Sequence, residues 1–375
     1  MDFDIDKFKF LHCLDMNFLT LSIAGLWCPS SVYGTMKGDL YHVYSLFVLG
    51  CGFFLYLTSE IIYVIGELEK VVEVSFLLVT HMGQLFKIIE FLRKRDKIRE
   101  LVNKLDDDIF NRKNPSHTAI KQRTTYVAER DTKFFFYLTL ATVGMWGLLP
   151  MLDRSGQRFL PLKAWYPFDT QSSPNYQLVY LYQMMTVMVS ANCNLSLDCL
   201  TSGMMGIIGG QLDILKLDLV SIWRKEVIPK DTSKPISYHE IEDFPVKSNT
   251  EKLRDCIKHH QAIIKLYVKN VVRYFIVMLC YLQLSVTSFP FFSIVLYQFC
   301  MLIEIALYCF HGNEVIISVM DAAYETGWYE EDTNFKQMLI ILMERCKRPL
   351  SPRAGMIFPL SLATFVGVSY LYTCK

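Results

Sequence analysis

Long apolar runs dominate this sequence and constrain its fold more than any other feature. A helix that crosses the hydrocarbon core of a bilayer needs about 20 mostly apolar residues. Seven segments reach or approach that length: residues 41–65, 71–92, 134–152, 176–212, 263–288, 291–310 and 354–373. The hydrophobic content of 52% and the mean hydropathy of +0.25 are concentrated in these runs. We therefore expect an all-α membrane protein with seven transmembrane helices.

Ionisable residues inside two of these runs need an explanation. The second run contains Glu73, His81, Lys87 and Glu90, and such groups are costly in lipid unless they face protein. The fourth run contains Asp198, for which we expect a structural hydrogen bond near the inner membrane boundary. A shorter apolar run, residues 14–27, is too short to span and is interpreted as a re-entrant or interfacial piece.

The basic residues predict the orientation of the chain. Twelve Lys and Arg lie in residues 93–133, nine in 206–258 and five in 311–353, whereas the connections on the opposite side hold four. Loops rich in Lys and Arg stay in the cytoplasm. We therefore expect a cytoplasmic N-terminus and an extracellular C-terminus. This orientation is the reverse of that of G-protein-coupled receptors, so we exclude that class.

Enzymatic, metal-binding and nucleic-acid-binding functions find little support. The net charge of +1 provides no field for nucleic acid, and no GxSxG, HExxH or P-loop motif occurs. Asp255, Cys256, His259 and His260 are close in sequence, but adjacent histidines point to different helix faces and do not converge on one ion. We expect no metal, no cofactor and no catalytic site.

A series of local patterns in the second half of the chain resembles one known family. In chain order the patterns are Trp165-Tyr166-Pro167-Phe168-Asp169, Gly210-Gln211-Leu212-Asp213, His259-His260-Gln261, Tyr308-Cys309-Phe310-His311-Gly312-Asn313-Glu314, Gly327-Trp328-Tyr329, Arg348-Pro349-Leu350 and Pro359-Leu360-Ser361-Leu362. Taken together, on seven helices with the N-terminus inside, they are similar to the insect odorant receptors. The chain resembles an odour-specific subunit rather than the longer shared co-receptor.

The resemblance implies a function and a division of the chain. It implies a ligand-gated, non-selective cation channel of four subunits in the plasma membrane of olfactory sensory neurons, assembled with co-receptor subunits and passing monovalent and divalent cations. Residues 1–40 would form a cytoplasmic N-terminal segment and residues 41–310 six helices with the odorant pocket in their outer half. Residues 311–353 would form a cytoplasmic anchor, and residues 354–375 the pore helix with a short extracellular tail.

The outer halves of the second to sixth helices supply the apolar and aromatic walls that a pocket for a small volatile needs. For any one residue, core packing or lipid contact is the alternative. The candidates are Val74, Leu77, Leu78, Thr142, Met145, Trp146, Leu149, Tyr180, Gln183, Met184, Val187, Cys280, Tyr281, Leu284, Tyr297, Gln298 and Met301. Trp146 is the favoured single candidate, because its ring can stack on an aromatic odorant and its N–H can donate to a polar group.

Two further sets of residues are candidates for the pore and for subunit contacts. The uncharged last run offers small and apolar residues near its outer end, where a ring of apolar side chains can gate by dewetting. The pore candidates are Ser361, Thr364, Val368, Leu371 and Tyr372, and the interface candidates are Tyr308, Asn313, Glu314, Tyr324 and Trp328. An ordinary packed helix and an anchor within one subunit are the respective alternatives.

Two other functions remain compatible with this reading of the sequence. A gustatory receptor-like channel of the same fold would have a more polar pocket for a non-volatile ligand. A seven-helix transporter would need charged groups at mid-membrane, and the third and seventh runs carry none.

Overall fold

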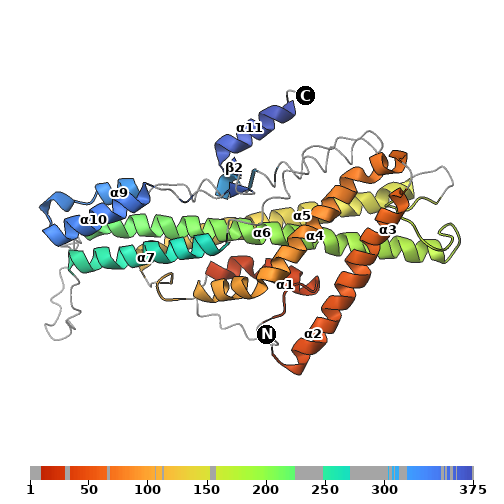
Figure 1. Ribbon diagram of the computed structural model, residues 1–375, viewed down its shortest axis with the longest axis horizontal. Helices are drawn as coiled ribbons and strands as arrows, with labels where there is room; N and C mark the ends of the chain where they lie inside the picture. Colours follow the sequence, from red (N-terminus) through yellow and green to blue (C-terminus); the bar gives the residue numbers. More distant parts are fainter. Residues whose placement is uncertain are drawn as a thin grey trace, which may run out of the picture.

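Long helices running side by side form the body of the molecule in the computed structural model (Figure 1). The structure describes residues 10–29, 34–65, 68–105, 107–111, 114–152, 158–223, 248–270, 303, 306–307, 309–311, 319–347, 350, 353–354, 358–359 and 361–373. Most of the predicted fifth and sixth runs therefore lies outside the described residues. So do nine candidate residues: Cys280, Tyr281, Leu284, Tyr297, Gln298, Met301, Tyr308, Asn313 and Glu314. The side chains of Val74, Leu77, Leu149, Val368, Leu371 and Tyr372 are likewise not described.

The N-terminal third contains one continuous helical stretch of membrane length. It comprises α2 (Met36–Phe47), a π-helical segment η2 (Val48–Phe54) and α3 (Leu55–Val64). Within the described part of the chain this stretch, 29 residues with a mean hydropathy of 1.7, is the one long and apolar enough to cross a membrane. It begins before residue 41, where the apolar run starts. A 3-10 turn η1 (Phe10–Leu14) and the short helix α1 (Asp15–Ile23) precede it.

Three very long helices follow: α4 (Leu68–Lys104), α5 (Pro115–Leu152) and α6 (Asn175–Trp223). At 1.5 Å per residue the 49 residues of α6 extend about 73 Å, more than twice the hydrocarbon thickness of about 30 Å. Helix α6 therefore forms the axis of the molecule, and α5 packs along it (Figure 1).

The remaining elements are shorter. They are α7 (Asn249–Asn270), α9 (Met320–Tyr324), η4 (Trp328–Glu330), α10 (Thr333–Cys346), the strands β1 (Arg353–Ala354) and β2 (Phe358–Pro359), and α11 (Leu362–Thr373). Helices α7, α9 and α10 surround one end of α6 (Figure 1).

The basic connections predicted as polar loops are largely helical, which corrects two helix starts. Helix α5 begins at Pro115 rather than at residue 134, because the Asn114 carboxamide accepts a hydrogen bond from the Ser116 N–H at 3.1 Å and Pro115 suits a first helical position. Helix α7 begins at Asn249 rather than at residue 263, because Ser248 and Glu251 form a reciprocal capping box with bonds of 3.2 and 3.1 Å. Hydropathy detects only the part of a helix that lies in lipid.

The seventh predicted run is wrong at its start. Ala354 and Phe358 are paired in the antiparallel strands β1 and β2, and the helix begins only at Leu362. Pro359 has no N–H to donate inside a helix. The Ser361 hydroxyl accepts a hydrogen bond from the Thr364 N–H at 3.3 Å and so caps α11.

The largest core cluster lies between α1, α6, α7 and α10. Leu21, Ile208, Ile263 and Leu339 are fully buried in it. Two glycines bring helices close to α6, because a Cβ at Gly203 would lie 2.8 Å from the Leu14 side chain and one at Gly210 would lie 2.5 Å from the Thr124 hydroxyl. Residues 14–27 therefore pack against protein through one face.

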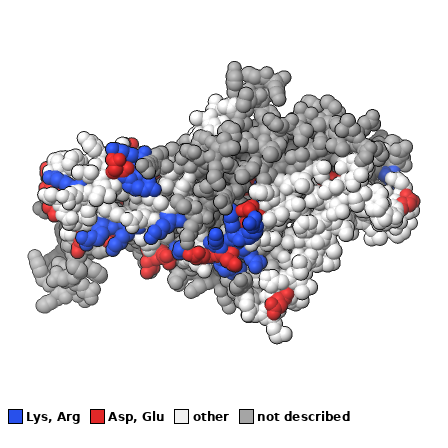
Figure 2. Space-filling model, in the orientation of Figure 1, with Lys and Arg blue, Asp and Glu red and all other residues white. Residues whose placement is uncertain are grey.

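Charged side chains are unevenly distributed along the molecule. On the face drawn in Figure 2, Lys, Arg, Asp and Glu gather over the end formed by α7, α9 and α10 and over the middle, and the half that contains α3 is nearly free of them. This distribution separates a polar end from an apolar end. The candidate pocket residues of α5 and α6 belong to the apolar end.

Candidate functional site

Trp146 lies in a small aromatic and apolar cluster at the apolar end. Tyr56 of α3 and Leu162 of the loop between α5 and α6 are buried, and Trp146, Ala164 and Val187 pack against them. Helices α3, α5 and α6 and the loop thus converge on one place. An aromatic wall of this kind suits a small apolar ligand.

Helices α5 and α6 meet closely beside Trp146. The Tyr180 hydroxyl donates to the Gly147 carbonyl, and a Cβ at Gly147 would lie 2.5 Å from the Met184 methyl carbon. The predicted residues Trp146, Tyr180, Met184 and Val187 are therefore neighbours. Each is partly buried.

Other predicted pocket residues have different surroundings. Leu78 packs against the large core cluster. The Thr142 hydroxyl donates to the Leu138 carbonyl at 2.8 Å within its own helix, and Met145 is half-buried. Among the described candidates of α5, Trp146 is therefore the one that packs in the cluster with Tyr56 and Leu162.

Gln183 is fully buried and holds the outer loop against α6. Its carboxamide oxygen accepts a hydrogen bond from the Leu162 N–H at 3.1 Å, and its nitrogen donates to the Leu162 carbonyl at 3.0 Å and to the Tyr166 hydroxyl at 3.1 Å. These three bonds fix the loop over the Trp146 cluster. The loop backbone is further tied to α3, because the Trp165 N–H donates to the Ser59 carbonyl at 3.1 Å.

Two ionisable groups of the second predicted run, His81 and Lys87, have buried protein partners. The His81 imidazole lies 2.8 Å from a Glu60 carboxylate oxygen, and the Lys87 ammonium lies 2.6 Å from an Asp198 carboxylate oxygen and 3.1 Å from the Asn194 side-chain oxygen. The expectation that Asp198 makes a structural contact is confirmed. Pairing of this kind is how a membrane helix accommodates charge.

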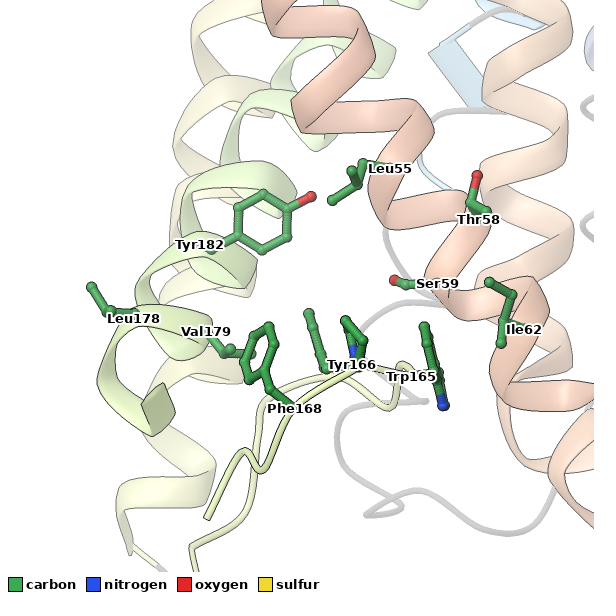
Figure 3. A pocket seen from close by; sticks show the side chains of 11 residues that line it. Leu55, Thr58, Ser59, Ile62, Trp165, Tyr166, Phe168, Leu178, Val179 and Tyr182 are labelled. Atoms are coloured by element: carbon green, nitrogen blue, oxygen red, sulfur yellow. The ribbon is translucent and has the colours of Figure 1, made fainter. Parts of the chain in front are cut away.

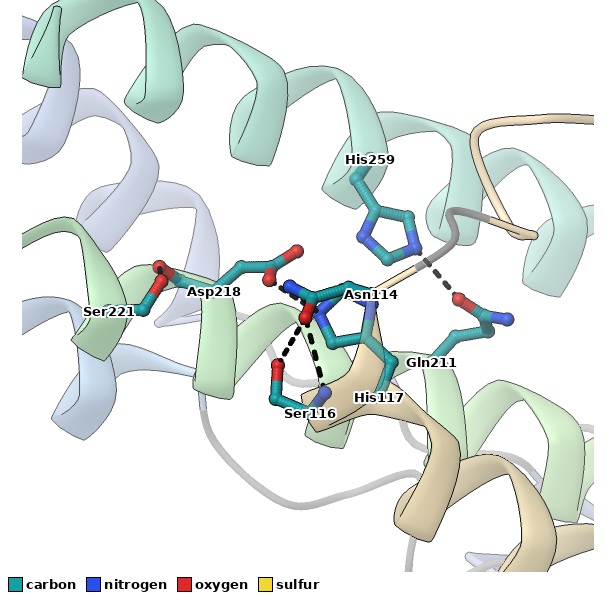
Figure 4. Close-up of polar contacts among 7 residues, drawn as sticks. All are labelled: Asn114, Ser116, His117, Gln211, Asp218, Ser221 and His259. Carbon is teal, nitrogen blue, oxygen red and sulfur yellow. Dashed lines mark hydrogen bonds and ion pairs between the residues drawn. The ribbon is translucent and has the colours of Figure 1, made fainter. Parts of the chain in front are cut away.

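At the polar end, the Gly210-Gln211 and His259-His260 patterns come together (Figure 4). The His259 imidazole lies 2.9 Å from the Gln211 side-chain oxygen, whereas His260 faces the Cys346 sulfur at 3.9 Å. Burial, together with the charge of Arg345, lowers the pKa of His260. The adjacent histidines have different partners, as their helical positions predict.

Of the interface candidates that are described, Tyr324 and Trp328 are in contact with each other. Their ring centroids lie 6.3 Å apart. Tyr324 is 67% exposed, whereas Trp328 packs against the core. Of the pore candidates, Ser361 and Thr364 contact each other through their hydroxyls at 3.1 Å.

Sequence reasoning missed the contribution of α3 and of the outer loop. Tyr56 and Leu162 were absent from the candidates, although both contact the Trp146 cluster. The apolar run that contains Tyr56 was interpreted only as a membrane span. The signal for the loop is the pattern Trp165-Tyr166-Pro167-Phe168, which also carries part of the family resemblance.

Comparisons with known proteins place these observations in a family context. The family described as 7tm Odorant receptor matches residues 67–370. Odorant receptor 46a, isoform A, of Drosophila melanogaster is 27% identical over 336 residues, which cover 82% of this chain and 82% of that protein. Odorant receptor Or1 of Anopheles gambiae is 21% identical over an alignment that covers 95% of this chain and 93% of that protein.

A solved structure has the same fold over nearly the whole chain. The insect olfactory receptor OR5 from Machilis hrabei in complex with eugenol superimposes with a TM-score of 0.73 at 19% identity, and covers 96% of each chain. A further structure of the same receptor superimposes with a TM-score of 0.72. This likeness confirms the seven-helix fold of the insect olfactory receptors.

Proposed function

We propose, because the chain belongs to the 7tm odorant receptor family, that it is an odorant-gated, non-selective cation channel subunit. In this proposal it assembles with co-receptor subunits into a heterotetramer in the plasma membrane of olfactory sensory neurons. A small volatile binds within the helix bundle and opens a pore that the subunits share. The chain is a receptor of a multi-pass membrane family, and its relatives are named as odorant receptors rather than enzymes.

The observation that carries the proposal is the Trp146 cluster. It lies at the apolar end of the bundle, where α3, α5, α6 and the outer loop converge, and its walls are aromatic and aliphatic. A small, mostly apolar volatile matches such walls. Eugenol, the ligand of the Machilis hrabei receptor, is a molecule of this class. Eugenol should therefore be included in the first panel of odorants.

We propose the same residues for the pore and for the subunit contacts as the sequence predicts. Helix α11 is uncharged over Leu362–Thr373, which suits a pore wall, and Ser361 stands at its start. The exposed ring of Tyr324 suits a contact with another subunit, whereas the packed ring of Trp328 supports it from within.

The test is co-expression of the chain with an insect co-receptor in oocytes, with odour-evoked current as the measurement. We expect inward current that needs both subunits and that Trp146→Ala abolishes, with surface assembly unchanged. Leu148→Ala is the matched control, because Leu148 is two residues away on α5 and is 58% exposed. A normal odour response of the Trp146→Ala receptor would refute the assigned pocket. No current across a broad panel, despite surface expression, would refute the channel.

A further inference from the structure

A hollow lies beside α3, and none of the residues that line it belongs to the Trp146 cluster. Its volume is about 570 Å³, and its walls come from α3, from residues 165–168 of the outer loop and from the first turns of α6 (Figure 3). Small-molecule pockets in proteins have volumes of roughly 300–1,000 Å³. The hollow therefore has the size of a site for one small molecule.

Helix α3 separates this hollow from the Trp146 cluster. Leu55, Ser59 and Ile62 are spaced along one helix face and line the hollow, whereas Tyr56 and Glu60 point into the bundle and are fully buried. Leu55 and Tyr56 are consecutive, as are Ser59 and Glu60, and consecutive residues do not share a helix face. The residues that line the hollow are therefore a different set from those of the Trp146 cluster.

Three hydroxyls of the hollow are restricted to accepting hydrogen bonds. Thr58, Ser59 and Tyr182 each donate their single hydroxyl hydrogen to a backbone carbonyl at 2.7 Å. A hydroxyl that has donated its hydrogen retains lone pairs but no further donor. These groups therefore give no attraction to a ketone, ester or ether oxygen.

Tyr166 also lines the hollow and differs from these three hydroxyls. Its hydroxyl oxygen accepts a hydrogen bond from the Gln183 amide, and no acceptor for its own hydrogen is recorded among the described residues. An ordinary phenol keeps its hydrogen at neutral pH, and burial raises the pKa of Tyr166 further. The hollow thus offers one hydrogen-bond donor set among apolar and aromatic walls.

The mouth of the hollow opens on an apolar surface. Leu55, Phe168 and Leu178 line it and are 56%, 48% and 62% exposed. Leu55 belongs to the helical stretch Met36–Val64 that has membrane length and composition. A molecule dissolved in the outer leaflet therefore reaches this mouth without crossing water.

We propose that this hollow is a second binding site, for a small lipophilic molecule with a single oxygen acceptor such as a ketone. The molecule enters from the outer leaflet, places its aliphatic or aromatic part between α3 and α6, and accepts a hydrogen bond from Tyr166. A phospholipid is much larger than the hollow and is not the expected occupant. The site shares with the proposed function only the membrane location of the chain.

The test is photolabelling of the full chain in phosphatidylcholine vesicles with 4-azidoacetophenone, followed by peptide mass spectrometry. We expect labelled peptides from α3 and from residues 165–182, and we expect excess acetophenone to suppress the label. Ethylbenzene has the same shape but no oxygen, so we expect it to compete about five- to tenfold more weakly. The measurement needs no current and no co-receptor, so it is independent of the gating proposal.

One pair of variants and one single variant make the test specific. Leu178→Trp fills the mouth and should abolish the suppressible label, whereas Leu181→Trp, at a position 60% exposed on the same helix but outside the hollow, should not. Tyr166→Phe should remove the advantage of acetophenone over ethylbenzene. Equal labelling of the two tryptophan variants, or suppressible label confined to the region of Trp146, would overturn the proposal.

Discussion

At the residue scale, Glu60 is a fully buried acidic residue at the apolar end, paired with His81. Its carboxylate is fully buried, one oxygen is held by His81 at 2.8 Å, and the other has no hydrogen-bond partner among the described residues. The Tyr56 ring and the same imidazole form a T-shaped contact, with ring centroids 5.3 Å apart. A buried carboxylate depends on its partner, because desolvation otherwise disfavours the charge.

Replacing only one member of this pair should therefore be more harmful than replacing both. We expect His81→Leu to destabilise the receptor by about 3 kcal/mol, because it leaves a buried carboxylate without its partner. Glu60→Leu combined with His81→Leu should recover most of this loss. The measurement is the thermal unfolding midpoint of the detergent-solubilised chain. A double variant that unfolds as early as His81→Leu would contradict the argument.

At the element scale, the sequence predicted helices within the membrane better than helices outside it. Apolar runs located part of each of the helices α4, α5 and α6, because a transmembrane helix requires continuous hydrophobicity. The polar extensions of α5 and α7 depend on caps at Asn114 and Ser248 and on packing against α6, which leave only weak local signals. For the same reason the cluster around Trp146 was only partly predicted, since Tyr56 and Leu162 join it through tertiary packing.

One buried side chain of α6, Gln183, holds the first part of the loop after α5. We expect Gln183→Leu to release it, because all three hydrogen bonds of that carboxamide end on Leu162 and Tyr166. Hydrogen exchange of the Leu162 amide should then become at least about fivefold faster. Mass spectrometry of peptides covering residues 158–168 measures this rate.

Gln177→Leu provides the control for the loop experiment. Gln177 lies on α6 near its start and is exposed, so the same substitution there should leave the exchange rate unchanged. If both variants exchanged equally fast, the loop would be held by something other than Gln183.

At the scale of the whole molecule, length and charge divide the receptor into two parts. Helix α6 extends about 73 Å, so a large part of it projects beyond the bilayer. The projecting end is the one that carries α7, α9 and α10, and charged side chains gather there (Figure 2). The apolar end carries the Trp146 cluster and the hollow beside α3, which places both candidate sites on the side opposite to the charged end.

The orientation of the molecule follows from the same division. Because the charged end carries most of the Lys and Arg, it should stay in the cytoplasm, and the loop that contains Trp165 should face outward. An epitope inserted between Gln171 and Ser172, which are exposed in that loop, should bind antibody on intact cells. An epitope placed before Phe10 should become accessible only after the cells are permeabilised. The opposite pattern of accessibility would reverse the assignment and would place both candidate sites on the cytoplasmic side, out of direct reach of an external odorant.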